Sequence, residues 1–218
     1  MLHKTIKQKA RIKVWDIGTR LFHWALAVLF CLSAFSAFQD KFGIYADMHL
    51  WSGFSILVLV TWRIIWGVIG SEPSRFRHFV KSPKALLAYL RGKGPEAVGH
   101  NPLGGYSVLL MLLMLLAQAM LGLFASDGMF FGGPLEAGDD YSSLVNNTHQ
   151  MLGYGLFGVV GFHVLIVFGY WALRRVNLIL PMITGWAEHS AEAPNIARPL
   201  LALLLVLIVA AALYGLIF

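Results

Sequence analysis

Four histidines of this 218-residue chain stand within or at the ends of apolar runs long enough to cross a membrane. They are His23, His49, His149 and His163. An ionisable side chain in such a run usually marks a site. The other four histidines lie in polar segments, where water can satisfy an imidazole, so we expect solvated or capping residues there. They are His3, His78, His100 and His189.

Helical geometry sorts the first four histidines into two levels. Fourteen residues separate His149 from His163, which places the two side chains within about 40° of one helix face and about 21 Å apart along its axis. With spans alternating in direction, His49 matches the depth of His149, and His23 matches that of His163. Each level then holds two imidazoles from two different helices. This arrangement suits a six-coordinate haem iron with the porphyrin between the helices.

A glycine follows each of two histidines after four residues, Gly53 after His49 and Gly153 after His149. A residue without a side chain, one turn away on the same face, leaves clearance for a flat macrocycle. Close helix crossing through small residues is the alternative explanation for either glycine alone. A catalytic zinc site is disfavoured, because it normally takes three protein ligands at one place and each level offers two.

Two arginines near the membrane surface are candidates for pairing with haem propionates. Arg20 stands three residues before His23, and Arg63 lies near the end of the second apolar run. A guanidinium can hold a carboxylate through two hydrogen bonds. Ordinary snorkelling of the charged group to the interface explains both positions equally well.

The elements that must position these residues are membrane-spanning helices. The chain is 58% hydrophobic and 13% charged, whereas soluble domains average about 45 to 50% apolar and about 25% charged residues. This composition excludes a soluble enzyme, a disordered chain and a fibrous repeat. We expect an all-α integral membrane protein with spans at about residues 16–38, 49–70, 105–125, 148–173 and 200–218.

The distribution of charge predicts the orientation of these spans. Sixteen of the seventeen Lys and Arg residues fall on one side of the spans, and Lys41 is the exception. Because basic residues near span ends stay in the cytoplasm, we expect a cytoplasmic amino terminus and a carboxyl terminus on the far side. The same rule accounts for the net charge of +6, so nucleic acid is not expected as a partner.

An ordered set of motifs resembles the bacterial cytochrome b561 and nickel-iron hydrogenase b-type cytochrome family. The motifs cover roughly residues 13 to 186 and are, in order, RLFHW, MHLWSG, TWRIIWG, GHNPLGG, FFGGPL, HQMLGYGLFGVVGFH and NLILPMITG. The resemblance implies a four-helix transmembrane bundle in a bacterial inner membrane, with a b-type haem near each face. It assigns His23 with His163 to the inner haem and His49 with His149 to the outer one, the pairs that depth also favours.

The last apolar run departs from this resemblance. We expect residues 1–186 to form the di-haem domain, 187–199 a polar cytoplasmic linker and 200–218 an additional membrane helix that ends in the periplasm. The additional helix contains neither histidine nor charge, so no cofactor is assigned to it. It either packs against the bundle or contacts another subunit.

The resemblance implies electron transfer between the membrane quinone pool and a redox partner on the periplasmic face, such as a cytochrome c or a hydrogenase-like subunit. The acidic outer segment 127–147 contains no basic residue and could dock a basic partner, although solvation explains its charges as well. We expect an electron-transfer subunit rather than a stand-alone enzyme.

Two alternatives to this function remain open. One, also known in the family, is superoxide oxidation coupled to quinone reduction, which would make the chain an enzyme in its own right. The other, from a different class, is a haem-free membrane anchor or small transporter whose histidines relay protons or join helices through hydrogen bonds.

Overall fold

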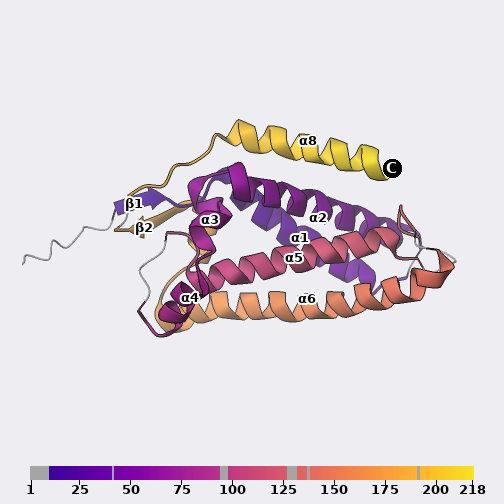
Figure 1. Cartoon of the computed structure of the whole chain (residues 1–218), viewed down its shortest axis with the longest axis horizontal. Coiled ribbons are helices and arrows are strands. Elements are labelled where there is room, and N and C mark those ends of the chain that lie inside the picture. Colours follow the sequence, from indigo (N-terminus) through magenta and orange to yellow (C-terminus); the bar gives the residue numbers. More distant parts are fainter. Residues whose placement is uncertain (1–9, 41, 94–97, 127–131, 137, 191) are drawn as a thin grey trace, which may run out of the picture.

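The computed structural model describes residues 10–40, 42–93, 98–126, 132–136, 138–190 and 192–218. His3, Lys41 and residues 127–131 of the acidic outer segment lie outside these ranges. Among the described residues, five helices are long and apolar enough to cross a membrane. They are α1 (Ile17–Ala37), α2 (Ile44–Ile69), α5 (Pro102–Phe124), α6 (Asp139–Arg174) and α8 (Pro199–Ile217). They lie roughly side by side in one bundle (Figure 1), so the prediction of an all-α membrane protein is confirmed.

Two of these helices begin earlier than predicted. Helix α2 begins at Ile44 rather than near 49, and α6 begins at Asp139 rather than near 148. The predicted starts followed hydropathy, which changes where the chain leaves the membrane. A helix can continue past that point, because its backbone hydrogen bonds form in water as well. At 1.5 Å per residue, α6 is therefore about 54 Å long and projects beyond an apolar core of about 30 Å.

The first four long helices pack in chain order. Helix α1 packs against α2, α2 against α5, and α5 against α6. Helices α1 and α6 meet through aromatic rings, since Phe30 and Phe38 each lie 5.9 Å from Phe157 between ring centroids. Buried side chains from all four of these helices join in the core, among them Phe22, Trp66, Leu112 and Leu156.

Helix α8 packs along α1 and α2 on the outside of this four-helix arrangement (Figure 1). The indole Nε1 of Trp62 donates a hydrogen bond to the carbonyl of Ala202 at 3.1 Å. A Cβ added to Gly18 would lie 2.8 Å from the Cβ of Ala202, so α1 and α8 are in close contact. At the other end of α8, Phe218 stacks on Trp51 at 5.4 Å. Of the two roles left open for this helix, the structure shows packing against the bundle.

Short elements cover one end of the bundle, the end at which α8 begins (Figure 1). Strands β1 (Ala10–Lys13) and β2 (Trp186–His189) pair antiparallel, with Ala10 opposite His189. The segment between α2 and α5 forms η1 (Glu72–Ser74), α3 (Phe76–Phe79) and α4 (Pro83–Leu90), and α7 (Ile179–Thr184) precedes β2. Four-residue strands show too little alternation to be recognised in a sequence, and β2 extends into the segment expected to be a linker.

Gly185 connects α7 to the segment that follows β1 at this end of the bundle. It ends α7 with φ of 86°, a conformation that suits glycine. Its carbonyl accepts hydrogen bonds from the backbone N–H groups of Val14 and Trp15 at 2.8 and 3.2 Å. The segment after β1 is thereby tied to the end of α7, and the side chain of Trp15 is held in a buried position.

Candidate functional site

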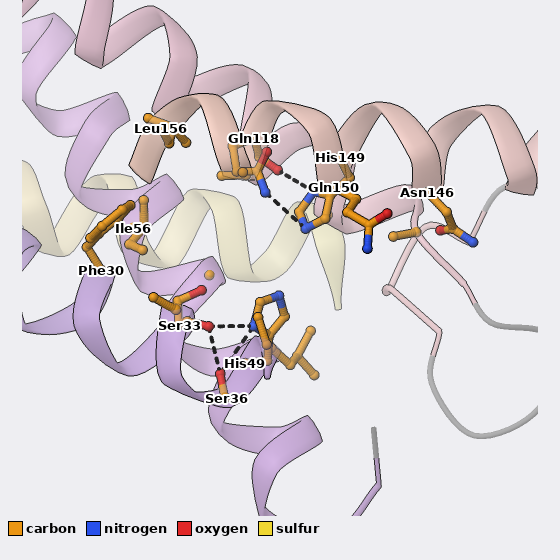
Figure 2. Close-up of a pocket in the computed structure, with 18 of the residues that line it drawn as sticks. Phe30, Ser33, Ser36, His49, Ile56, Gln118, Asn146, His149, Gln150 and Leu156 are labelled. Atoms are coloured by element: carbon orange, nitrogen blue, oxygen red, sulfur yellow. Dashed lines mark hydrogen bonds between the residues drawn. The ribbon is translucent and has the colours of Figure 1, made fainter. Parts of the chain in front are cut away.

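His49 of α2 and His149 of α6, the outer pair, face each other across a cavity (Figure 2). Their ring centroids are 6.2 Å apart and the ring planes meet at 84°. The cavity has a volume of about 460 Å³, within the range of about 300 to 1,000 Å³ typical of small-molecule sites. Four helices line it, and apolar side chains such as Phe30, Ile56 and Leu156 form much of its wall.

Both imidazoles of the outer pair are oriented through Nδ1. That atom of His49 lies 3.0 Å from the carbonyl of Ser33 and 3.2 Å from the hydroxyl of Ser36, and that of His149 lies 3.1 Å from the carbonyl of Gln118. A carbonyl oxygen only accepts, so Nδ1 carries the hydrogen and Nε2 has the lone pair. At His149 this lone pair accepts a hydrogen bond from the side-chain amide of Gln118 at 3.2 Å. Metal-ligating imidazoles in proteins usually have such a partner behind them, which fixes the tautomer.

The spacing of the outer pair fits two ligands on opposite sides of one metal ion. A metal–nitrogen bond of about 2 Å and about 1 Å from nitrogen to ring centre on each side would separate the centroids by about 6 Å. The observed 6.2 Å agrees with this separation. Among the described residues, no three or more side chains of His, Cys, Asp or Glu come together as a metal site. A haem, whose porphyrin supplies the other four ligands, is the group that this donor set fits.

Gly53 and Gly153 both line the cavity of the outer pair. A Cβ added to Gly53 would meet nothing within 4 Å, and one added to Gly153 would meet only the Nε2 of Gln118 at 3.3 Å. Gly122 of α5 also lies in the site, and an added Cβ there would stand 3.2 Å from Cε1 of His149. Nothing in the sequence pattern pointed to Gly122, because it follows no histidine and its neighbour is on another helix.

His23 of α1 and His163 of α6, the inner pair, are close enough to interact electrostatically. His163 lies nearer than His149 to the end of α6 at which the short elements gather (Figure 1). The Nδ1 of His23 is buried and has no hydrogen-bond partner in the described part of the chain. The ring of Trp24 contacts that of His23 edge-on at 5.1 Å. The structure thus places the outer pair in ring contact, and it places the inner pair within electrostatic range.

Arg63 is buried at the inner end of α2. Its exposed fraction is 2%, so it does not snorkel to water. The guanidinium carbon lies 5.5 Å from the ring centre of Phe76 and 5.8 Å from that of Phe79, and Nη1 has no hydrogen-bond partner within the described residues. A buried donor without a partner is costly, so this position favours an acceptor supplied by a ligand.

Arg20 is partly engaged by the protein itself. Its Nη1 donates to the carbonyl of Ile183 at the end of α7, whereas its Nε is buried and lacks a partner in the described chain. Trp24, one turn further along α1, donates a hydrogen bond to the carbonyl of Met182 at 3.3 Å. This side of α1 therefore contacts the end of α7. One edge of the Arg20 guanidinium therefore holds α7 in place.

The prediction that His100 is a solvated or capping residue was wrong. Its ring lies between those of Trp15 and Phe79, at centroid distances of 4.8 and 4.9 Å, and its Nδ1 is buried without a partner among the described residues. Burial and the positive charge of Arg63 lower the pKa of His100 to about 3. The segment is polar, but it folds back over the end of the bundle. The sequence feature that could have indicated this burial is the position of His100 directly before Asn101, which caps α5.

Comparison with known families agrees with this geometry. The sequence model described as prokaryotic cytochrome b561 matches residues 14–185. The resemblance inferred from the motifs is thereby confirmed. Among curated proteins, none matches the chain. The matched range contains α1, α2, α5 and α6 with all four histidines of the two pairs, and it leaves α8 outside.

Proposed function

The chain belongs to the prokaryotic cytochrome b561 family, and we propose that it is a di-haem cytochrome that moves electrons across the bacterial inner membrane. Membership makes it a b-type cytochrome of transmembrane electron transfer. The number of haems, their ligands and the two ends of the electron route are our proposal. The observation that carries it is the outer pair, His49 and His149, with ring centroids 6.2 Å apart across a cavity.

The proposed outer haem lies between His49 and His149, and the inner haem between His23 and His163. When bound, each haem supplies a one-electron iron couple. The protein holds and orients the ligands, since the carbonyls of Ser33 and Gln118 fix both imidazoles in the tautomer with the lone pair on Nε2. At His149 the metal would replace the side-chain amide of Gln118, which donates to Nε2 at 3.2 Å. Gly53 and Gly153 give clearance to the macrocycle.

Arg20 and Arg63 are the proposed partners of the propionates. Both lie at the inner end of the bundle, and each has a buried guanidinium nitrogen without a hydrogen-bond partner among the described residues. A propionate oxygen would satisfy such a donor with a charge-assisted hydrogen bond. Arg63, at 2% exposure, fits this role more closely than Arg20, which also donates to Ile183.

We assign the end that carries β1, α3 and α4 to the cytoplasm. Described basic residues gather there, among them Lys13, Arg75, Lys84 and Arg175. The positive-inside rule supports this orientation, with the outer pair near the periplasmic face. The proposed route then joins quinone in the bilayer to a periplasmic redox partner, a cytochrome c or a hydrogenase-like subunit.

Haem content tests the ligand pairs directly. Purified protein in detergent should contain two haems per chain and show a reduced-minus-oxidised α band. His149→Ala should remove the outer haem and His163→Ala the inner one, each leaving one haem per chain, because a single imidazole holds iron poorly in a six-coordinate site. The measurement is haem per polypeptide by absorbance.

His78→Ala is the matched control, because His78 is partly exposed beside Glu72 at 3.3 Å. It should keep both haems. Wild-type protein without a Soret band would support the haem-free anchor or transporter instead. A His149→Ala protein that retains two haems would show that the outer pair is assigned incorrectly.

Superoxide oxidation at the outer haem, coupled to quinone reduction, is the second candidate. The cavity of the outer pair reaches Asp40 and Asn146 at polar positions beyond its apolar wall. Quinone reduction by superoxide, assayed on the purified protein without a partner, distinguishes the two functions. Activity at a rate above that of the His149→Ala variant would make this chain an enzyme in its own right.

A further inference from the structure

Arg63 is a buried cation without a direct counter-ion among the described residues. The acid in electrostatic contact with it is Asp16, which caps the amino end of α1. Its carboxylate already accepts hydrogen bonds from four donors: the backbone N–H and hydroxyl of Thr19 at 2.8 and 2.7 Å, the hydroxyl of Ser74 at 3.0 Å and the indole of Trp66 at 3.4 Å. Asp16 is thus saturated by neighbours other than Arg63. The Nη1 of Arg63 remains available to an anion from elsewhere.

His100 lies in the same region as Arg63, and both side chains lie close to the ring of Phe79. The ring of Phe79 lies 5.8 Å from the guanidinium carbon of Arg63 and 4.9 Å from the ring of His100. Trp15 fixes the other side of the imidazole. The imidazole is held by contacts with both rings, and its Nδ1 is buried without a hydrogen-bond partner among the described residues. Two polar groups without partners therefore lie in one region, next to the same phenylalanine.

This region adjoins the inner pair. His100 interacts electrostatically with Arg63, His163 and His23. A cation and a neutral imidazole can together bind a carboxylate, the first through its charge and the second through an N–H hydrogen bond. A ligand that binds between His23 and His163 and carries carboxylates at its edge would place one of these carboxylates next to Arg63 and His100.

We propose that Arg63 and His100 form a carboxylate-binding pocket, and that it holds a propionate of the inner haem. This inference rests on the proposed function, because it requires a haem at the inner pair. It makes the segment between α2 and α5 part of the cofactor site, since Phe79 and His100 both belong to it. His100 then acts as a cofactor-binding residue that contacts the propionate rather than the iron.

Potentiometric titration of the purified holoprotein tests the pocket. His100→Phe keeps an aromatic ring between Trp15 and Phe79 but removes the hydrogen-bond donor. We expect the midpoint potential of the inner haem to fall, because the negative charge of the propionate is less compensated. Arg63→Met should lower it further, since it removes a full charge. The midpoint of the outer haem should stay unchanged in both variants.

Two further variants separate binding from packing. His100→Gln retains an N–H donor, so the midpoint of the inner haem should return toward that of the wild type. Arg77→Met removes an exposed cation on the same short helix as Phe79 and should leave both midpoints unchanged. If Arg63→Met fails to accumulate with haem, the His100→Phe and His100→Gln pair still decides the question.

Three results would overturn the inference. The first is an inner-haem midpoint that is the same in wild type, His100→Phe and Arg63→Met. The second is a His100→Gln variant as low as His100→Phe, which would indicate a role in packing. The third is a wild-type midpoint that moves on addition of acetate, which would indicate a soluble carboxylate in the pocket. Absence of haem from the wild type would instead contradict the proposed function itself.

Discussion

At the scale of single residues, the two outer imidazoles are held differently. Nδ1 of His149 donates to the carbonyl of Gln118, whereas Nδ1 of His49 lies near both the carbonyl of Ser33 and the hydroxyl of Ser36. That hydroxyl donates its own hydrogen to the Ser33 carbonyl at 3.0 Å, so it accepts from the imidazole. Acceptors behind a ligating imidazole raise its basicity and so stabilise the oxidised metal.

Ser36→Ala should therefore raise the midpoint potential of the outer haem. It removes one of the two acceptors at Nδ1 of His49, while the carbonyl of Ser33 continues to orient the ring. Haem content should stay at the wild-type value. A redox titration followed in the α band measures the shift, with the inner haem as an internal reference.

Ser33→Ala is the control for this change. It leaves the backbone carbonyl in place, because the acceptor at position 33 is the main chain. The midpoint should match that of the wild type. Equal shifts in the two variants would mean that the hydroxyl of Ser36 has no part in tuning His49.

The residues that could be predicted are those whose type alone is unusual for their place. Imidazoles in apolar runs stand out, and their depths follow from helical rise, so both pairs could be proposed before any packing was known. Ser36, Gln118 and Gly122 could not be found in this way. Their relevance depends on which face of α1 or α5 turns toward a histidine on another helix, and His100 depends on a fold-back of the chain.

At the scale of elements, α2 is the central helix, since α1, α5 and α8 all pack against it. Hydropathy located all five long helices, because the membrane acts on each of them separately. It gave no indication of the β1–β2 pair or of the polar turns that open α2 and α6. Those parts lie beyond the apolar core, where pairing and capping decide the structure.

The contact between α1 and α8 provides a test of packing. Gly18→Ala should destabilise the protein by about 1–3 kcal/mol, because the new Cβ would stand 2.8 Å from the Cβ of Ala202 and 3.3 Å from the ring of Trp62. Thermal loss of the Soret band in detergent measures the effect. Gly215→Ala on α8 is the control, since a Cβ there meets nothing within 4 Å, and its transition should not fall. Equal transitions in the two variants would argue against close packing of α8.

At the scale of the whole molecule, α6 carries one histidine of each pair. The fourteen residues between His149 and His163 correspond to about 21 Å along the helix, most of an apolar core of about 30 Å. The two proposed haems therefore stand near opposite faces. Neither alone spans the core, so transfer across the membrane requires both.

This requirement can be tested in sealed vesicles that contain the purified protein. Ferricyanide trapped inside should be reduced by an impermeant donor added outside when both pairs are intact. His149→Ala and His163→Ala should each lower this transfer to the level of empty vesicles, although the haem that remains is still reducible in detergent. His78→Ala should transfer electrons as the wild type does. Transfer at the wild-type rate by either single-haem variant would mean that one haem suffices, and that the two levels of histidines have another purpose.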